Sequence, residues 1–144
     1  MPDAHDVEVR ADIPSLSRTV TREDVRAYAE VGGDRNPLHQ DEDVAHAAGF
    51  PTIVAHGMFT MGHLSACVSR WAGGPERIRR LKAQFRAPVF IGEEIVAGGR
   101  IKAIDDERGV ALLECWVSVE RDGETLWPVK RGEAEVLLEG QAPS

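Results

Sequence analysis

The chain has 144 residues, of which 42% are hydrophobic, and this is enough for one domain with a buried core. Its formal net charge of -7 and its pI near 5.2 argue against nucleic acid or an anionic membrane as the main partner. No uncharged apolar run reaches the roughly 18 residues of a transmembrane helix, and the acidic N-terminus lacks the pattern of a secretory signal. We therefore expect a single domain over residues 1–144, with its core at about 15–138, polar tails at both ends and a cytoplasmic location.

The two cysteines, Cys67 and Cys115, both lie in apolar stretches. This setting is typical of buried, reduced thiols, and it supports neither a disulfide framework nor a zinc site. The five histidines likewise lack metal-ligand spacing, so we expect no metal.

The first half of the chain predicts a short strand and two helices. Residues 16–20 read as the strand, and Thr21 as the N-cap of a helix that Gly32-Gly33 ends. A polar loop follows, and then a short helix over about residues 42–48, which Gly49 stops.

Residues 57–71 predict the longest helix of the chain. Apolar side chains cover nearly every side of it, and a helix that is apolar all round is a buried helix. We expect cover on every side, which a curled sheet wrapping around the helix would supply. Gly73-Gly74-Pro75 ends the helix.

From Ile78 onward the hydrophobic period changes to two, which predicts strands. They fall at about residues 78–87, 95–104, 110–121 and 125–138. Asp122-Gly123 is a strong hairpin signal between the last two, and Pro128 suits an edge or a bulge. Helices segregated from an antiparallel sheet make an α+β domain.

The loop GGDRNPLHQD carries a carboxylate and an imidazole, Asp34 and His39. The turn at Pro37 could bring the two side chains together over one small volume. Such a pair is suited to proton transfer, because histidine titrates near neutral pH. Taken alone the signal is weak, since Asp, Asn-Pro and His are all common in solvated turns.

Gly57 strengthens the case for chemistry. If it opens the long helix, its backbone N–H points outward with the positive end of the helix dipole behind it. Such an N–H can bind a developing oxyanion, and the lack of a Cβ lets a carbonyl approach closely. The alternative is a purely structural glycine. For the preceding His56 we favour a structural role, at the cap or in a pocket wall.

Other features favour structural roles. Ser65 lacks the Gly-x-Ser-x-Gly context of a serine nucleophile. A basic row could touch an anionic carrier or cofactor tail, but such a row is more often the solvated face of a strand. Its members are Arg77, Arg79, Arg80, Lys82 and Arg86.

The loop and the long helix together resemble the MaoC-like hydratases, the family of (R)-specific enoyl-CoA hydratases with a hot-dog fold. Three stretches carry the resemblance, in the family's order and spacing: Tyr28 followed by GDRNPLH at residues 33–39, AHGM at 55–58, and AQFRAPVFIGEEI at 83–95. The resemblance implies one hot-dog unit, an antiparallel sheet wrapped around a long central helix.

The resemblance also implies a mechanism. Asp34 and His39 would hold the water that adds across the double bond, with His39 favoured as the base, and Asn36 would support the loop. The Gly57 N–H would polarise the thioester carbonyl. From Gly57 onward Met61, Ser65 and Val68 follow on roughly one helix face, which makes them candidates for lining the acyl pocket.

The implied substrate is an acyl-CoA or acyl-carrier-protein thioester, and no metal or organic cofactor is needed. The resemblance implies a homodimer with its sheets joined edge to edge, although a heterodimer is open. Two other functions compete with the hydratase. A hot-dog thioesterase would not need the Asp/His pair, and a non-catalytic subunit of a heterodimeric dehydratase would be expected to lack it.

Overall fold

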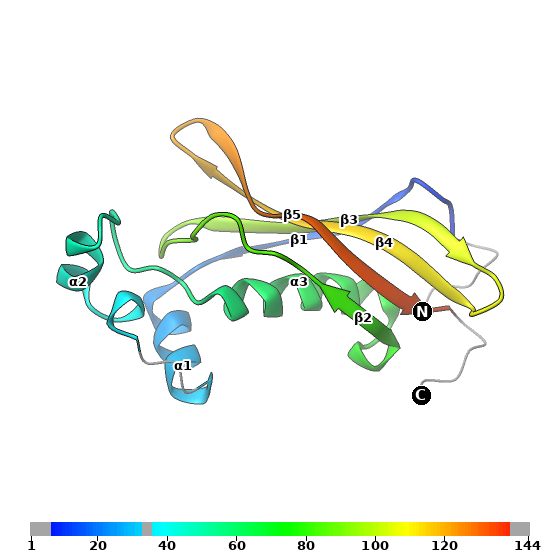
Figure 1. Ribbon diagram of the computed structural model, residues 1–144, viewed down its shortest axis with the longest axis horizontal. Helices are drawn as coiled ribbons and strands as arrows, with labels where there is room; N and C mark the ends of the chain where they lie inside the picture. Colours follow the sequence, from blue (N-terminus) through cyan, green and yellow to red (C-terminus); the bar gives the residue numbers. More distant parts are fainter. Residues whose placement is uncertain (1–6, 33–35, 139–144) are drawn as a thin grey trace.

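The computed structural model describes residues 7–32 and 36–138, which form one antiparallel sheet with a long helix against one face (Figure 1). The strands lie in the order β1-β3-β4-β5-β2. They are β1 (Asp12–Thr19), β2 (Ile78–Lys82), β3 (Glu94–Asp105), β4 (Val110–Arg121) and β5 (Glu124–Leu137). The helices are α1 (Arg22–Gly32), α2 (Glu42–Ala47) and α3 (Gly57–Ala72), with two 3-10 turns, η1 (Pro37–His39) and η2 (Pro75–Arg77).

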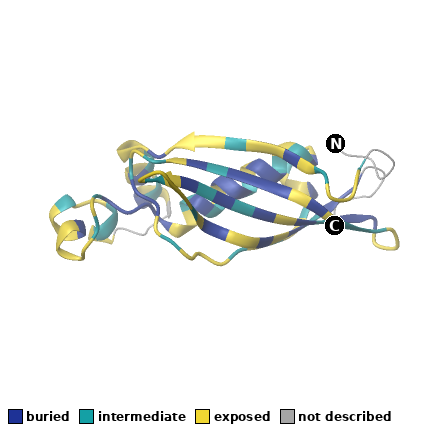
Figure 2. Cartoon of the chain, turned by 90° about the horizontal axis from the view of Figure 1, so that it is seen from above, coloured by how far each residue is buried: buried dark blue, intermediate teal, exposed yellow. Residues whose placement is uncertain are grey.

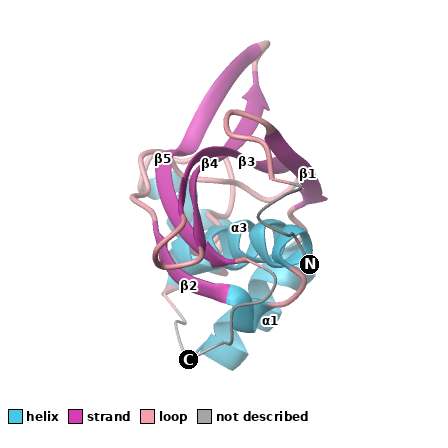
Figure 3. Cartoon of the chain, turned by 90° about the vertical axis from the view of Figure 1, so that its right-hand side faces the viewer, coloured by secondary structure: helices cyan, strands magenta, loops and turns pink. Residues whose placement is uncertain are grey.

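The core lies between α3 and the concave face of the sheet, which arches over the helix when the molecule is seen from its end (Figure 3). Leu64 and Val68 of α3 are fully buried there, as are Ile95 of β3 and Val117 of β4. Along the strands buried residues alternate with exposed ones (Figure 2), because one sheet face meets the helix and the other meets solvent. The predicted α+β hot-dog arrangement is confirmed.

The prediction that α3 is covered on every side is wrong for this chain. Met58 keeps 56% of its surface exposed, and Gly62, Ala66 and Arg70 are exposed on the same side, at a spacing of four residues. The sheet packs on the opposite side of the helix and reaches no further round it. None of the helices formed by the described residues is long and apolar enough to cross a membrane.

The local start and stop signals of the helices behave as predicted. Thr21 Oγ1 accepts a hydrogen bond from the Asp24 N–H at 3.0 Å, and Asp24 Oδ2 accepts one from the Thr21 N–H at 3.2 Å. These reciprocal bonds form a capping box. At the end of α3, Gly73 adopts φ 95°, a left-handed conformation that suits glycine.

The strand predicted over residues 78–87 is too long, since β2 ends at Lys82. Within the rest of that predicted strand, residues 83–87, only Phe85 forms a bridge, to Val129 of β5. Pro128 lies next to that bridge and has no N–H to donate, so a regular ladder cannot continue there. The pairing of β4 with β5 also shifts register between Val117 and Val119, so the irregularity predicted at Pro128 is a bulge. Between β4 and β5, the hairpin residues Asp122 and Gly123 have φ values of 53° and 80°, as the hairpin signal predicts.

Candidate active site

A pocket of about 380 Å³ opens at the N-terminal end of α3. One wall is His39 with Val54 and Ala55, and the other is the segment 85–89. Gly57 and Thr60 of α3 line the pocket between them. The structure therefore brings together His39 and Gly57, which lie 18 positions apart in the sequence and were predicted to share a site.

His39 lies on η1, a turn that its own sequence builds. Asn36 Oδ1 accepts the Leu38 N–H at 3.0 Å and so caps the turn, and Pro37 occupies the first position, where its missing N–H costs nothing. The Leu38 carbonyl then accepts the Val54 N–H at 3.1 Å. This backbone bond ties the loop to the segment that enters α3. Asn36 therefore supports the turn locally, and its part in the reaction stays a prediction.

A hydrogen bond from the His39 imidazole to the backbone fixes the tautomer of the ring. Its Nδ1 lies 2.6 Å from the Val54 carbonyl oxygen. A carbonyl can only accept, so Nδ1 carries the proton and donates it. In the neutral ring this tautomer leaves Nε2 unprotonated, which is the state that a general base requires.

Three aromatic rings form a row behind this site. The His39 ring stacks on His56 with centroids 3.8 Å apart and planes at 24°. His56 in turn lies 4.8 Å from the Tyr28 ring, at a tilt of 45°. His56 is only 2% exposed, so the middle ring is a fixed part of the interior. The row holds the plane of the His39 ring from one side.

Gly57 is the first residue of α3, as predicted. The preceding His56 is extended, and its carbonyl accepts the first helical bonds, from the N–H groups of Phe59 and Thr60. Within the described part of the chain no acceptor faces the Gly57 N–H, as is normal for the first turn of a helix. This donor, with the helix dipole behind it, faces the pocket that His39 lines.

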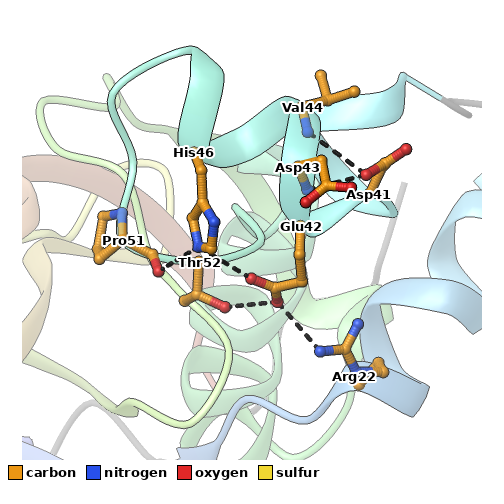
Figure 4. Close-up of polar contacts among 8 residues, drawn as sticks. All are labelled: Arg22, Asp41, Glu42, Asp43, Val44, His46, Pro51 and Thr52. Carbon is orange, nitrogen blue, oxygen red and sulfur yellow. Dashed lines mark hydrogen bonds and ion pairs between the residues drawn. The ribbon is translucent and has the colours of Figure 1, made fainter.

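A polar network on Glu42 fixes the loop from the other side (Figure 4). Glu42 Oε1 accepts hydrogen bonds from the Thr52 hydroxyl at 2.7 Å and from Arg22 at 3.0 Å. The bond from Thr52, followed by that from Arg22, lowers the pKa of the Glu42 carboxyl. His46 Nε2 lies 3.0 Å from the Pro51 carbonyl and 3.4 Å from Glu42. The network thus joins α1, α2 and the connector to α3 around the loop that carries His39.

The remaining predicted residues are placed differently. Asp34 lies outside the described residues, so its position relative to His39 stays a prediction. Val68 is fully buried in the core, while Met61 and Ser65 are partly exposed. None of these three lines the pocket beside Gly57, where Thr60 stands instead, and their acyl-pocket role also stays a prediction. Among the described residues no cluster of three or more His, Cys, Asp or Glu could hold a metal ion.

The basic row does not act as one surface. Arg77 is only 5% exposed, and its guanidinium donates to the carbonyls of Leu137 and Leu138 at the end of β5. Arg79, Arg80 and Lys82 are exposed on β2. Arg86 lines the pocket. Period-two alternation could not separate these roles, because the regular strand ends before Arg86.

Sequence reasoning also missed residues of the site. Phe85 was assigned to a half-buried strand face, yet it is 41% exposed and stands 3.5 Å from where a Cβ on Gly57 would lie. His56 was assigned a structural role, and its stacking on His39 was not foreseen. The sequence signal that could have found both residues was the family resemblance. Two of the stretches that carry it, AHGM at 55–58 and AQFRAPVFIGEEI at 83–95, contain His56 and Phe85.

Comparisons with known proteins agree with this fold. The family described as "MaoC like domain" matches residues 8–115. The 3-hydroxybutyryl-CoA dehydratase of Methylorubrum extorquens is 37% identical over 128 residues, which cover 85% of this chain and 82% of that protein. The (R)-specific enoyl-CoA hydratase of Rhodospirillum rubrum is 34% identical over 125 residues, covering 86% and 83%. The solved (R)-hydratase from A. caviae involved in PHA biosynthesis has a TM-score of 0.83 and 27% identity, covering 94% of this chain and 99% of that one.

Proposed function

This chain belongs to the MaoC-like family and is a hydro-lyase, and we propose that its reaction takes place in the pocket between His39 and Gly57. It interconverts trans-2-enoyl thioesters and (R)-3-hydroxyacyl thioesters by reversible addition of water. The chain spans more than four fifths of two relatives named for this type of reaction. The observation that supports the assignment to this pocket is the His39–Val54 hydrogen bond, which leaves Nε2 as the unprotonated nitrogen of a ring that lines the same pocket as Gly57.

In the hydration direction His39 Nε2 removes a proton from water, and the water oxygen forms a bond to the β-carbon. The electron pair of the double bond moves toward the carbonyl, so that negative charge develops on the thioester oxygen. The Gly57 N–H stabilises that charge, since a preorganised donor needs little reorganisation when the charge develops. Asp34 delivers a proton to the α-carbon, and Asn36 keeps the loop in shape.

No metal or organic cofactor enters this scheme. An acid, a base and one oxyanion donor supply every step, and the coenzyme A thioester is the substrate itself. The acyl chain would run from Gly57 along the α3 face that carries Met61, Ser65 and Val68.

The assembly we propose is a homodimer with the two sheets joined edge to edge. The exposed edge strand β2 is the candidate edge, because the segment that follows it, residues 85–89, forms one wall of the pocket. The site would then lie close to the subunit interface. A heterodimer with a related chain would use the same edge, and size measurement of the purified chain alone distinguishes the two.

A reducing, cytoplasmic location is proposed on chemical grounds. Cys67 and Cys115 are both buried and free. Burial raises the pKa of both thiols, that of Cys115 to about 12. Buried thiols of raised pKa are unreactive, and neither of the two forms a disulfide.

The reaction is tested with a chain-length series of trans-2-enoyl-CoA substrates, following loss of the conjugated double bond and release of free thiol. Hydration without thiol release establishes the hydro-lyase, and the length series measures the depth of the acyl pocket. Thiol release without hydration would point to a thioesterase instead. A lack of turnover with every coenzyme A substrate would contradict the assignment for the purified chain.

A further inference from the structure

The convex face of the sheet, opposite α3, carries a second hollow of about 280 Å³. Three strands line it, with Arg100 from β3, Glu114 and Trp116 from β4, and Trp127, Lys130 and Arg131 from β5. Trp116 points outward because its neighbours Cys115 and Val117 are fully buried on the inner face. The hollow therefore contains two of the three tryptophans of the chain, on the face that packs against no helix.

The hollow is shaped by a glycine. Gly98 of β3 pairs with Trp116 of β4, and a Cβ on Gly98 would stand 2.7 Å from Trp116 Nε1. Only glycine lets the indole lie over β3 in this way. The guanidinium carbon of Arg100 stands 5.9 Å from the centroid of the same ring. Trp127, on the opposite side, is 38% exposed.

The charge of the hollow is positive although the chain as a whole carries -7. Three cations, Arg100, Lys130 and Arg131, face one carboxylate, that of Glu114. Arg100 shares its charge with Asp12 through a contact of 2.9 Å. Within the described ranges neither Lys130 nor Arg131 lies within ion-pair distance of a carboxylate.

The hollow lies close to the catalytic pocket, and the segment 85–86, which pairs with residues 128–129 of β5, runs between the two. Phe85 bridges to Val129, and the Arg86 N–H donates to the Pro128 carbonyl at 2.9 Å. Phe85 faces inward, against Gly57. Side chains alternate along extended backbone, so Arg86 faces outward, on the side of Lys130. Arg86 lines the catalytic pocket as well, so this residue lies between that pocket and the outer face that carries the hollow.

We propose that this hollow binds the nucleotide end of a coenzyme A thioester while the acyl end reacts beside His39. An adenine ring stacks on exposed indoles, and guanidinium and ammonium groups pair with phosphates. Coenzyme A carries its thioester and its phosphorylated adenosine at opposite ends of a flexible pantetheine arm, which matches two adjacent sites joined by Arg86. The inference rests on the proposed function, and it assigns coenzyme A rather than acyl carrier protein as the carrier, because a carrier protein presents no nucleotide.

The test compares two substrates that differ only in the nucleotide, a trans-2-enoyl-CoA and the matching enoyl-pantetheine thioester. For each variant the ratio of their kcat/KM values is measured. We expect the ratio to fall at least tenfold in Trp127→Ala and in Lys130→Glu, chiefly through KM for the coenzyme A thioester. Lys102→Glu is the matched control for the charge reversal, since Lys102 is an exposed lysine of β3 that does not line the hollow. A ratio that stays at the wild-type value in both test variants overturns the proposal.

Binding is measured independently of turnover by titrating the protein with adenosine 3′,5′-bisphosphate and following tryptophan fluorescence. We expect saturable quenching that is at least tenfold weaker in Lys130→Glu and is not reproduced by adenosine alone. Absence of saturation with the bisphosphate at millimolar concentration contradicts the nucleotide site. If the protein hydrates neither thioester but still binds the bisphosphate, the proposed function fails and the nucleotide site stands.

Discussion

The imidazole rings of His39 and His56 stack at a centroid distance of 3.8 Å, which places a fully buried ring directly behind the proposed catalytic base. Removing that ring should let the His39 ring tilt away from the pocket. We expect His56→Ala to lower kcat by about 10- to 100-fold, since small misplacements of a catalytic group have effects of this size. His56→Phe keeps a flat ring in place and should retain more of the activity. Equal losses in the two variants would show that stacking is not what His56 contributes.

Gly57→Val should lower kcat/KM by about 100-fold or more, because its γ-carbons would occupy the space in front of the N–H that binds the oxyanion. The first added carbon meets only ordinary contact, 3.5 Å from the Phe85 ring. Gly57→Ala is therefore the control for folding and should be affected less. Steady-state kinetics on both variants, with circular dichroism to check the fold, decide the matter. Unchanged kinetics in Gly57→Val would dismiss the oxyanion role.

Arg77→Met should destabilise the fold by about 2 to 3 kcal/mol, because it leaves two buried carbonyl groups without their donor. Those acceptors are the backbone oxygens of Leu137 and Leu138. Arg79→Met, at an exposed neighbouring position on β2, should change stability by less than about 0.5 kcal/mol. Urea unfolding of the two variants measures the difference. Equal midpoints would mean that Arg77 is not an anchor for the end of β5.

His63 makes the stability depend on pH. Burial lowers the pKa of this ring, and the charges of Arg18 and Arg70 act in the same direction, against the hydrogen bond to the Leu16 carbonyl. The unfolded chain therefore binds a proton more readily than the folded chain. Stability contributed by the neutral ring is complete above the unfolded pKa and is lost as the pH falls through it toward the lower folded value.

The urea midpoint of the wild type should accordingly fall between pH 7.5 and pH 5.5 by more than that of His63→Gln, which keeps a side-chain donor without a titrating ring. An identical pH dependence in the two proteins would contradict this role of His63.

Local signals in the sequence were sufficient for much of the fold. The caps at Thr21 and Gly73 and the hairpin at Asp122-Gly123 depend on neighbouring residues only, and the structure has each of them where the sequence predicts it. The start of α3 at Gly57 is of the same kind. Because that start also defines the proposed oxyanion donor, this half of the candidate site was accessible from sequence.

Features that depend on distant segments were not accessible in this way. The extent of β2 depends on the bulge at Pro128 in another strand, and the burial of Arg77 depends on the end of β5. The ring row joins α1, η1 and the residue before α3, so no local periodicity could reveal it. For the same reason the sequence of the basic row does not distinguish the buried Arg77 from the exposed Arg79.

The measurement that tests the account most directly follows a trans-2-enoyl-CoA with wild type and His39→Ala side by side, and determines double-bond loss, free thiol and product configuration. We predict the (R)-3-hydroxyacyl-CoA without thiol release from the wild type. In the variant, turnover should fall by at least about 100-fold with the fold intact, and Asp34→Asn should show a comparable loss. Near-normal hydration by His39→Ala would contradict the account, as would thiol release by the wild type.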